Sequence, residues 1–203
     1  AGSGNIKNMP ALVGDGAGGV IIAWADYRSG STYEVYAQRF RPDGAMAWGS
    51  YGKRMIPSYT YSDEIRIVSD GSGGAIIVAS VYWDDESPND VYAQRVDHDG
   101  NLLWGARGAA VCAAEEHQYT PVLIPDGAGG AIIAWDDQRP ETGYDSDIYC
   151  QRMGASGLWG NPEPAIISCL DVPGDQGGWV RITTAASSHD AAGEIETPIF
   201  GYN

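Results

Sequence analysis

The sequence predicts an all-β fold built from repeated four-stranded units, and three observations support this prediction. The motif Asp-Gly-x-Gly-Gly occurs three times, beginning at Asp15, Asp70 and Asp126. Each copy is followed by an apolar run of strand length and later by a Tyr-x-Gln-Arg tetrapeptide. No segment has the apolar spacing of a helix of useful length. A period of about 55 residues with short strands and glycine-rich turns is typical of a β-propeller-type array of four-stranded blades.

The first unit illustrates how each element is assigned. Residues 11–13 form a short strand, and residues 14–19 form a tight connection in which glycine supplies positive φ angles. The run 20–24 is apolar throughout, so we expect a middle strand with both faces covered. Residues 33–40 give a third strand, and the turn at 42–44 combines proline and glycine before a fourth strand that begins at 45–48.

The other units repeat this order. The second comprises strands near 65–68, 75–79, 91–96 and 102–104, and the third comprises strands near 122–124, 131–135, 148–153 and 158–159, after a turn shortened at 155–157. A tryptophan closes each unit, at Trp48, Trp104 and Trp159. We therefore expect propeller-like repeats over residues 1–170, with blades at 10–57, 65–112 and 121–168: three full repeats and a partial fourth.

The fourth unit begins near Asp175 and then loses the repeat pattern. An open blade face forgoes roughly 12 kcal/mol if about 500 Å² of apolar surface stays uncovered, so the tail or a second molecule must cover it. One solution is a small closed ring completed by the chain's own terminal strands. The other is strand addition to a neighbouring subunit, with candidate inter-subunit residues Trp179, Val180, Ile182, Ile195, Ile199 and Tyr202.

Composition and charge limit the possible partners. The net charge is -15, and no basic cluster offsets it, so nucleic acid is excluded as an expected partner. No apolar stretch reaches the length of a membrane span, so we expect no membrane insertion. The chain starts at Ala1 without methionine, which favours export and an extracellular or cell-surface location. The three cysteines match no zinc pattern, and Cys150 occupies a slot that holds alanine in the other units.

The combined pattern resembles the propeller-like repeats of bacterial secreted and cell-surface proteins. It comprises Asp-Gly-x-Gly-Gly, an aliphatic run, Trp-x-Asp-x-Arg, Tyr-x-Gln-Arg, Asp-Gly and Leu-Trp-Gly, and it covers residues 10–167. Residues 171–182 resemble the entry into a fibronectin-type-III-like domain. The match departs from that family at Thr184, where a core tryptophan is expected, and too few residues follow for a complete domain. We therefore expect residues 171–203 to be a partial fourth blade or a strand-exchange tail.

Two Trp-x-Asp-x-Arg segments are the best candidates for chemistry. They place Asp26 and Arg28, and likewise Asp137 and Arg139, on one side of a strand end, near the Gln-Arg pairs of the following strand. This resembles the sialidase-like arrangement, in which arginines hold a carboxylate and an aspartate assists proton transfer. The structural interpretation is that each pair ties neighbouring strands together. Unit two carries Val81 and Trp83 in these slots, which favours the structural interpretation.

No catalytic constellation, metal site or cofactor motif is present in the sequence. The histidines lack ligand spacing and are expected at the surface, and the acidic turns follow no calcium-loop pattern. We expect a non-catalytic, exported structural or adhesive module that self-associates as a homo-polymer or homo-oligomer, with a fibre built by terminal strand addition. The alternative is a carbohydrate-binding lectin or sialidase-like glycoside hydrolase that uses Asp26, Arg28, Asp137 and Arg139.

Overall fold

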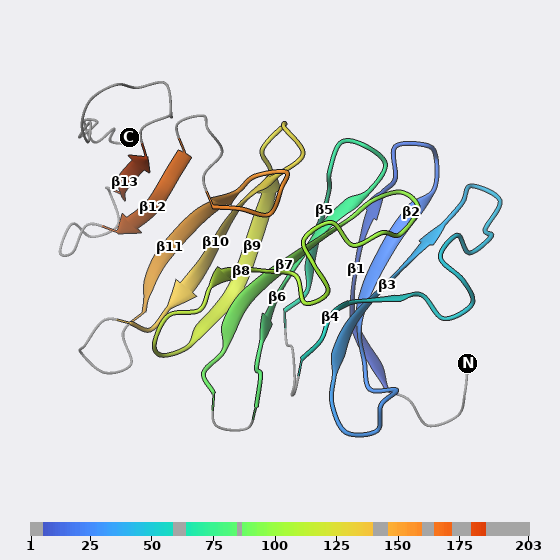
Figure 1. Cartoon of the computed structure of the whole chain (residues 1–203), viewed down its shortest axis with the longest axis horizontal. Coiled ribbons are helices and arrows are strands. Elements are labelled where there is room, and N and C mark those ends of the chain that lie inside the picture. The colour runs from blue at the N-terminus through green and yellow to red at the C-terminus, as the bar shows by residue number, and fades with distance from the viewer. Residues whose placement is uncertain are drawn as a thin grey trace.

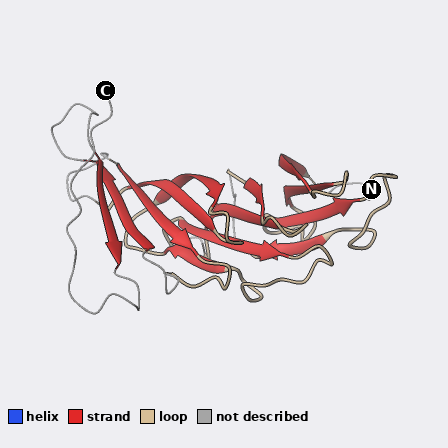
Figure 2. Ribbon diagram, turned by 90° about the horizontal axis from the view of Figure 1, so that it is seen from above, coloured by secondary structure: helices blue, strands red, loops and turns tan. Residues whose placement is uncertain are grey.

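The computed structural model describes residues 6–58, 64–84, 87–139, 146–159, 165–171 and 180–185, the last two ranges as backbone only. The described residues form thirteen β-strands and no helix, which confirms the all-β prediction (Figures 1 and 2). Within these described ranges, no helix is long and apolar enough to cross a membrane.

Two sheets are four-stranded antiparallel meanders with their strands in chain order. The first sheet contains β1 (Lys7–Gly14), β2 (Val20–Asp26), β3 (Glu34–Phe40) and β4 (Lys53–Ile56). The second sheet contains β5 (Arg66–Ser69), β6 (Ala75–Val81), β7 (Asp90–Val96) and β8 (Ala109–Cys112). In each, the apolar run after the glycine motif is an inner strand, as predicted.

The third sheet has three strands, in the order β11-β10-β9. They are β9 (Gln118–Pro125), β10 (Ala131–Asp137) and β11 (Asp147–Met153). The next strand, β12 (Ala165–Asp171), lies against β11 but pairs with β13 (Val180–Ala185) in a two-stranded sheet (Figure 1). The third unit thus follows the order of the first two up to its third strand.

The three sheets stack in sequence order, and alternation along each strand defines two faces. We call the face turned toward the following sheet the front face and the opposite one the rear face. The front face of the first sheet, including Ile21 and Ala23, packs on the rear face of the second, including Ile77. The front face of the second sheet, including Ile76, packs on the rear face of the third, including Ile133. Every residue of β6 is buried because it lies between two sheets.

The first strands of the sheets form one row. β1 contacts β5, and β5 contacts β9, so the start of each unit lies beside the start of the next. Both β1 and β9 carry a bulge in their pairing with the inner strand. At these bulges Met9 and Thr120 adopt positive φ angles of 53°. Such angles are sparsely populated by residues other than glycine, and most of all by β-branched residues.

The Asp-Gly-x-Gly-Gly motif forms the same tight connection in each unit. Oδ1 of Asp70 accepts hydrogen bonds from the backbone N–H groups of Ser72 and Gly74, and Asp15 and Asp126 accept the equivalent pair. The last glycine has no room for a side chain, because a Cβ on Gly74 would lie 2.2 Å from the carbonyl oxygen of Val96. The glycine is therefore required by close packing as well as by turn geometry.

Two expectations about the ends of the units are wrong. The fourth strands begin at Lys53 and Ala109, after the segments predicted to form them, which make only the isolated bridges Phe40–Met46 and Val96–Leu102. The third turn is not shortened: Gly157 donates to the carbonyl of Gly154 as Gly100 does to Asp97. The third unit is shorter than the second after the turn, between the turn and the closing tryptophan. Trp159 therefore takes the bridge position of Leu102 and not the position of Trp104.

The packing of the motif predicts a large effect for one methyl group. Gly74→Ala places its Cβ against the Val96 carbonyl oxygen and within 2.9 Å of Oδ2 of Asp70, so we expect a loss of about 2 kcal/mol in the free energy of unfolding. Urea denaturation measures it. Gly14→Ala is the matched control, because no atom lies within 4 Å of its Cβ. Equal midpoints for the two variants contradict this account.

Candidate functional site

Asp26 is fully buried at the end of β2, and neighbouring residues donate hydrogen bonds to both of its carboxylate oxygens. Oδ2 accepts hydrogen bonds from Nε1 of Trp24 (2.8 Å) and from the Arg28 guanidinium, and Oδ1 accepts from the backbone N–H of Arg28. The guanidinium lies 3.7 Å from the ring centroid of Tyr36 and also donates to the carbonyl of Tyr51. Burial raises the pKa of Asp26, but the hydrogen bonds from Arg28 and Trp24 outweigh it and the pKa is lowered.

Asp137, at the end of β10, repeats this arrangement. Nε1 of Trp135 donates to Oδ2 (2.8 Å), and Arg139 forms a two-pronged ion pair with Nε on Oδ1 and Nη2 on Oδ2. The Arg139 guanidinium lies 4.1 Å from the ring centroid of Tyr149. Burial raises the pKa of Asp137, yet the bonds from Arg139 and Trp135 lower it overall. Both carboxylates are held ionised with every oxygen engaged.

The second sheet shows what can replace this pair. Val81 stands at the aspartate position, and Trp83 packs edge-on against Tyr92, with ring centroids 4.8 Å apart. Trp83 therefore takes the place on the tyrosine ring that an arginine takes in the other two sheets. An apolar pair fills the same space as the ion pair, which supports a packing role for the Asp-x-Arg segments.

The residues suggested for a carbohydrate site do not converge. Asp26 and Arg28 belong to the first sheet and Asp137 and Arg139 to the third, with the second sheet between them. The expected proximity to the Gln-Arg pairs is also wrong. Asp26 pairs with Glu34, whereas Arg39 pairs with Ile21 near the opposite end of the strand, because the antiparallel register reverses the order.

A second series of ion pairs, which sequence reasoning missed, uses the aspartates of the glycine motif. Nε of Arg39 donates to Oδ2 of Asp15 (2.9 Å), and the pairs Arg95–Asp70 and Arg152–Asp126 repeat the contact. Hydrogen bonds lower the pKa of Asp15, with the backbone N–H of Ala17 as the largest contribution. The recurrence of both residues in every unit was the available signal.

The same arginines join each sheet to the next. The carbonyl oxygen of His98, in the turn of the second sheet, accepts from Nη1 of Arg39 (3.2 Å) and from Nε1 of Trp48 (3.0 Å). One unit later, the carbonyl oxygen of Ala155 accepts from Arg95 (3.1 Å) and Trp104 (3.0 Å). In the third sheet the displaced Trp159 is 61% exposed and its indole donates to Ala110 instead.

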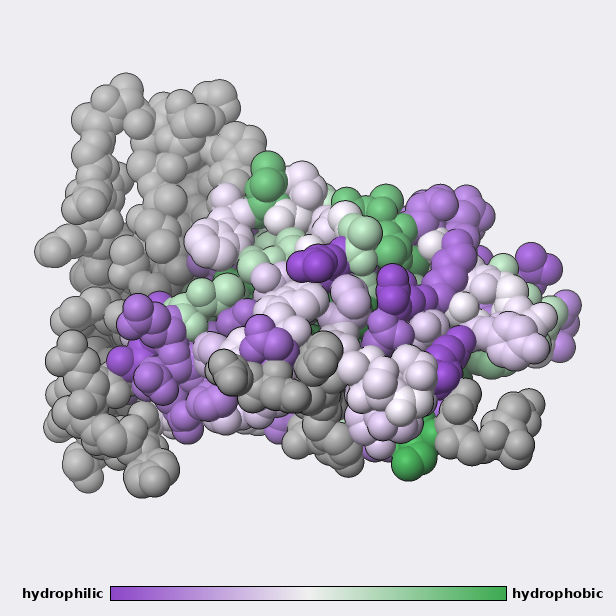
Figure 3. All heavy atoms as spheres, turned by 60° about the horizontal axis from the view of Figure 1, so that its bottom comes forward, coloured by the Kyte–Doolittle hydropathy of each residue, from purple (hydrophilic) through white to green (hydrophobic). Residues whose placement is uncertain are grey.

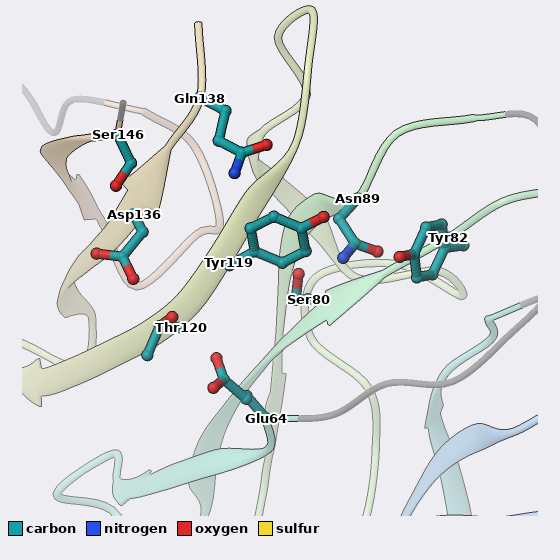
Figure 4. Close-up of a pocket in the computed structure, with 9 residues that line it drawn as sticks. All are labelled: Glu64, Ser80, Tyr82, Asn89, Tyr119, Thr120, Asp136, Gln138 and Ser146. Carbon is teal, nitrogen blue, oxygen red and sulfur yellow. The ribbon is translucent and has the colours of Figure 1, made fainter. Parts of the chain in front are cut away.

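A cavity of about 420 Å³ lies where β6 and β10 end, around the bulge of β9 (Figure 4). Its lining includes Glu64, Asp136, Tyr119 and the strained Thr120, together with Asn89 from the start of the β7 segment. Lysine, arginine and histidine are all missing from the described lining. Within the described part of the chain, this is a polar hollow with two acids.

The remaining candidates for chemistry are engaged in structure. His117 was expected at the surface, but its ring stacks on Tyr119 (centroids 5.3 Å apart) and its Nδ1 accepts from the backbone N–H of Asn89. His98 is exposed beside Asp99, as expected. Cys112 and Cys150 are both buried, and burial raises the pKa of Cys112. Among the described residues, no group of three His, Cys, Asp or Glu side chains is arranged to hold a metal ion.

The tail residues proposed for strand exchange divide in two. Val180 and Ile182 lie in β13, which pairs with β12 of the same chain. Trp179, Ile195, Ile199 and Tyr202 lie outside the described residues, as does His189. The exposed Tyr51 supplies the carbonyl that Arg28 binds.

Comparison of the chain with known protein families, with characterised proteins and with solved structures gave no match.

The buried carboxylate of Asp137 predicts a pH-dependent contribution to stability. Because its folded pKa is lowered, that contribution is complete above the unfolded value of about 3.9 and is lost as the pH falls through the folded pKa. Asp137→Asn leaves Arg139 without its partner, so we expect a loss of about 2 kcal/mol at pH 7 and a smaller loss of stability on acidification than in the wild type. Urea unfolding at neutral and acidic pH measures both.

The control for this substitution is Asp43→Asn. Asp43 is exposed, and an asparagine oxygen can still accept from the backbone N–H of Ala45. We expect this variant to match the wild type at each pH. An Asp137→Asn variant whose acid sensitivity equals that of the wild type rules out the Asp137 carboxylate as a source of the pH dependence.

Proposed function

We propose that the chain is a non-catalytic structural or adhesive module whose copies associate head to tail through the two outer sheets. The observation that carries this proposal is that the stack ends in two apolar faces of complementary type. The rear face of the first sheet exposes Leu12 (66% exposed), which pairs with Ile22. The front face of the third sheet exposes Ile124 (60% exposed), which pairs with Ile132.

The internal interfaces support a head-to-tail partner for each end face. At both interfaces inside the chain, a front face packs on a rear face. The front face of the third sheet repeats that of the second, with apolar residues at the equivalent positions: Ile124 for Val68, Ile132 for Ile76, Ala134 for Val78, Ile148 for Val91 and Cys150 for Ala93. Ile124 and Ile148 on this front face are exposed, as is Leu12 on the rear face of the first sheet, so the two end faces can pack by the rule that the chain's own sheets follow.

The Trp-x-Asp-x-Arg segments show what the rear face of the first sheet lacks. Trp135 stacks on Tyr149 and is only 5% exposed, because the second sheet covers it. Trp24 stacks on Tyr36 in the same way but is only half-buried. The turns differ likewise: a Cβ on Gly100 or Gly157 would meet a tryptophan of the preceding sheet, whereas Gly44 has no atom within 4 Å of that position. The front face of a second molecule, packed on the rear face of the first sheet, would supply the neighbour that Trp24 and Gly44 lack.

The same stacking of sheets suggests an architecture for the whole assembly. We propose that the sheets are blades of a β-propeller-type array, supported by the row of first strands formed by β1, β5 and β9. Head-to-tail junctions that close give a ring of fixed size, and those that do not close give a fibre. Strand addition by the tail is a second possible junction. In that case β13 would use the edge that is not paired with β12. An extracellular location stays a prediction from the sequence.

The rival assignment to a lectin or glycoside hydrolase has less support. Its four named residues form two separate, internally satisfied ion pairs that stack on tyrosines. A catalytic or ligand-binding carboxylate needs a free oxygen or a proton to exchange, and these have neither.

Substitutions on the end faces test the proposal. We expect the wild type to sediment as a dimer or larger species, and Leu12→Glu or Ile124→Glu to weaken association at least about tenfold, because each places a charge in an apolar interface. Analytical ultracentrifugation over a range of protein concentrations measures this. A single species of fixed size indicates a closed ring, and growth with concentration indicates a fibre.

Leu103→Glu is the control, since it adds the same charge to a 42% exposed residue of the second sheet, away from both end faces. A mixture of Leu12→Glu and Ile124→Glu provides a further check. Each retains one intact face, so head-to-tail association gives a one-to-one complex in the mixture that neither variant forms alone. A wild type that stays monomeric at high concentration contradicts the proposal.

A further inference from the structure

The cavity around the bulge of β9 is a site that the proposed assembly does not use. It lies near the end of the strands that carries Asp137, with lining residues drawn from segments far apart in the sequence (Figure 4). Its volume of about 420 Å³ falls in the range of small-molecule sites. We propose that it binds an organic ammonium group, either on a small amine or on a lysine side chain.

Charge is the first argument for this ligand class. Glu64 and Asp136 both line the cavity, and neither has an ion-pair partner within the described chain. The buried carboxylates of Asp15, Asp26 and Asp137 each hold an arginine. The two cavity acids therefore repel anions and attract a cation.

Unsatisfied acceptors are the second argument. Asn89 lines the cavity and is 6% exposed, and its Oδ1 is shielded from solvent without a hydrogen-bond partner. Oε2 of Glu64 is in the same state. A buried acceptor without a donor is costly. An ammonium group offers three N–H donors and no acceptor, which suits a cavity whose lining has unpaired acceptors.

Aromatic rings complete the set. Tyr82 and Tyr119 line the cavity, and Figure 4 shows the Tyr119 hydroxyl pointing toward Asn89. Tyrosine rings attract organic cations through their π faces and accommodate the attached methylene groups. Carboxylates, amide oxygens and aromatic rings together favour an alkylammonium over a metal ion, and the described residues contain no metal-type cluster.

The strained backbone of Thr120 places two of these groups. Tyr119 pairs with Asp136 across the bulge, and Thr120 follows with φ of 53°. Met9 in the equivalent bulge of β1 has the same φ, so the strained bulge belongs to the repeated fold. Here the bulge brings Tyr119 and Asp136 to the same hollow.

Calorimetric titration of the full chain with 1,4-diaminobutane tests the proposal, with 1,4-butanediol as the uncharged molecule of the same length. We expect the diamine to bind and the diol not to. Glu64→Gln and Asp136→Asn each weaken diamine binding about tenfold, corresponding to about 1.4 kcal/mol. Asp99→Asn, which removes an exposed charge elsewhere, leaves binding unchanged. Urea midpoints establish that each variant folds.

Further titrations separate the sources of the ammonium group. Binding of Nα-acetyl-lysine amide as tightly as the diamine identifies a protein lysine as a ligand, and binding of the diamine alone identifies a free amine. Equal binding of the diol, binding of glucose in its place, no heat with either amine, or diamine binding unaffected by Glu64→Gln and Asp136→Asn overturns the proposal. Sedimentation is independent of this cavity, so failure here leaves the association proposal standing.

Discussion

The stack depends on one repeated junction, in which an arginine joins the carboxylate of its own sheet to a backbone carbonyl of the next. Arg39 binds Asp15 and the carbonyl oxygen of His98, and Trp48 donates to the same oxygen. The junction recurs one unit later, at Arg95. A guanidinium can serve both acceptors because its donors point in fixed, divergent directions. The bond to the carboxylate keeps the arginine in place, so the bond to the next sheet costs less side-chain entropy.

This junction explains why the sequence motif contains the residues it does. The aspartate accepts two backbone N–H groups of the turn with one oxygen and the arginine with the other. The last glycine leaves room for that carboxylate and for the neighbouring strand's carbonyl. A Cβ on Gly19 would lie 2.3 Å from the carbonyl oxygen of Phe40 and 2.5 Å from Oδ2 of Asp15. The motif is therefore both a turn and half of an inter-sheet joint. The joint also has a direction, because each sheet supplies the donors and the following one supplies the carbonyl.

The parts of the fold that follow from local chemistry could be predicted, and the parts set by tertiary contacts could not. The inner strands β2, β6 and β10 were evident because an uninterrupted apolar run requires cover on both faces. The fourth strands were placed too early because Trp48 and Trp104 resemble strand residues. Their function is to reach across to the next sheet, which no local pattern reveals. The pairing of β12 with β13 was likewise beyond reach, since the repeat pattern ends before it.

The candidate sites show the same division. The Asp-x-Arg segments were visible in the sequence, but only the structure shows that both carboxylate oxygens accept hydrogen bonds and that the guanidinium groups stack on tyrosines. The cavity had no signal, because Glu64, Asn89 and Asp136 come from three unrelated segments.

This acidic chain contains carboxylates of two kinds. Asp15, Asp70 and Asp126 recur in every unit, and each is matched by an arginine. Those that do not recur, Glu64 and Asp136, have no such partner within the described residues. Repetition marks what the architecture needs in every unit, so residues that break it at a cavity are free to serve a function specific to one place. The cavity acids, rather than the more conspicuous repeated pairs, are therefore where ligand chemistry in this molecule is best sought.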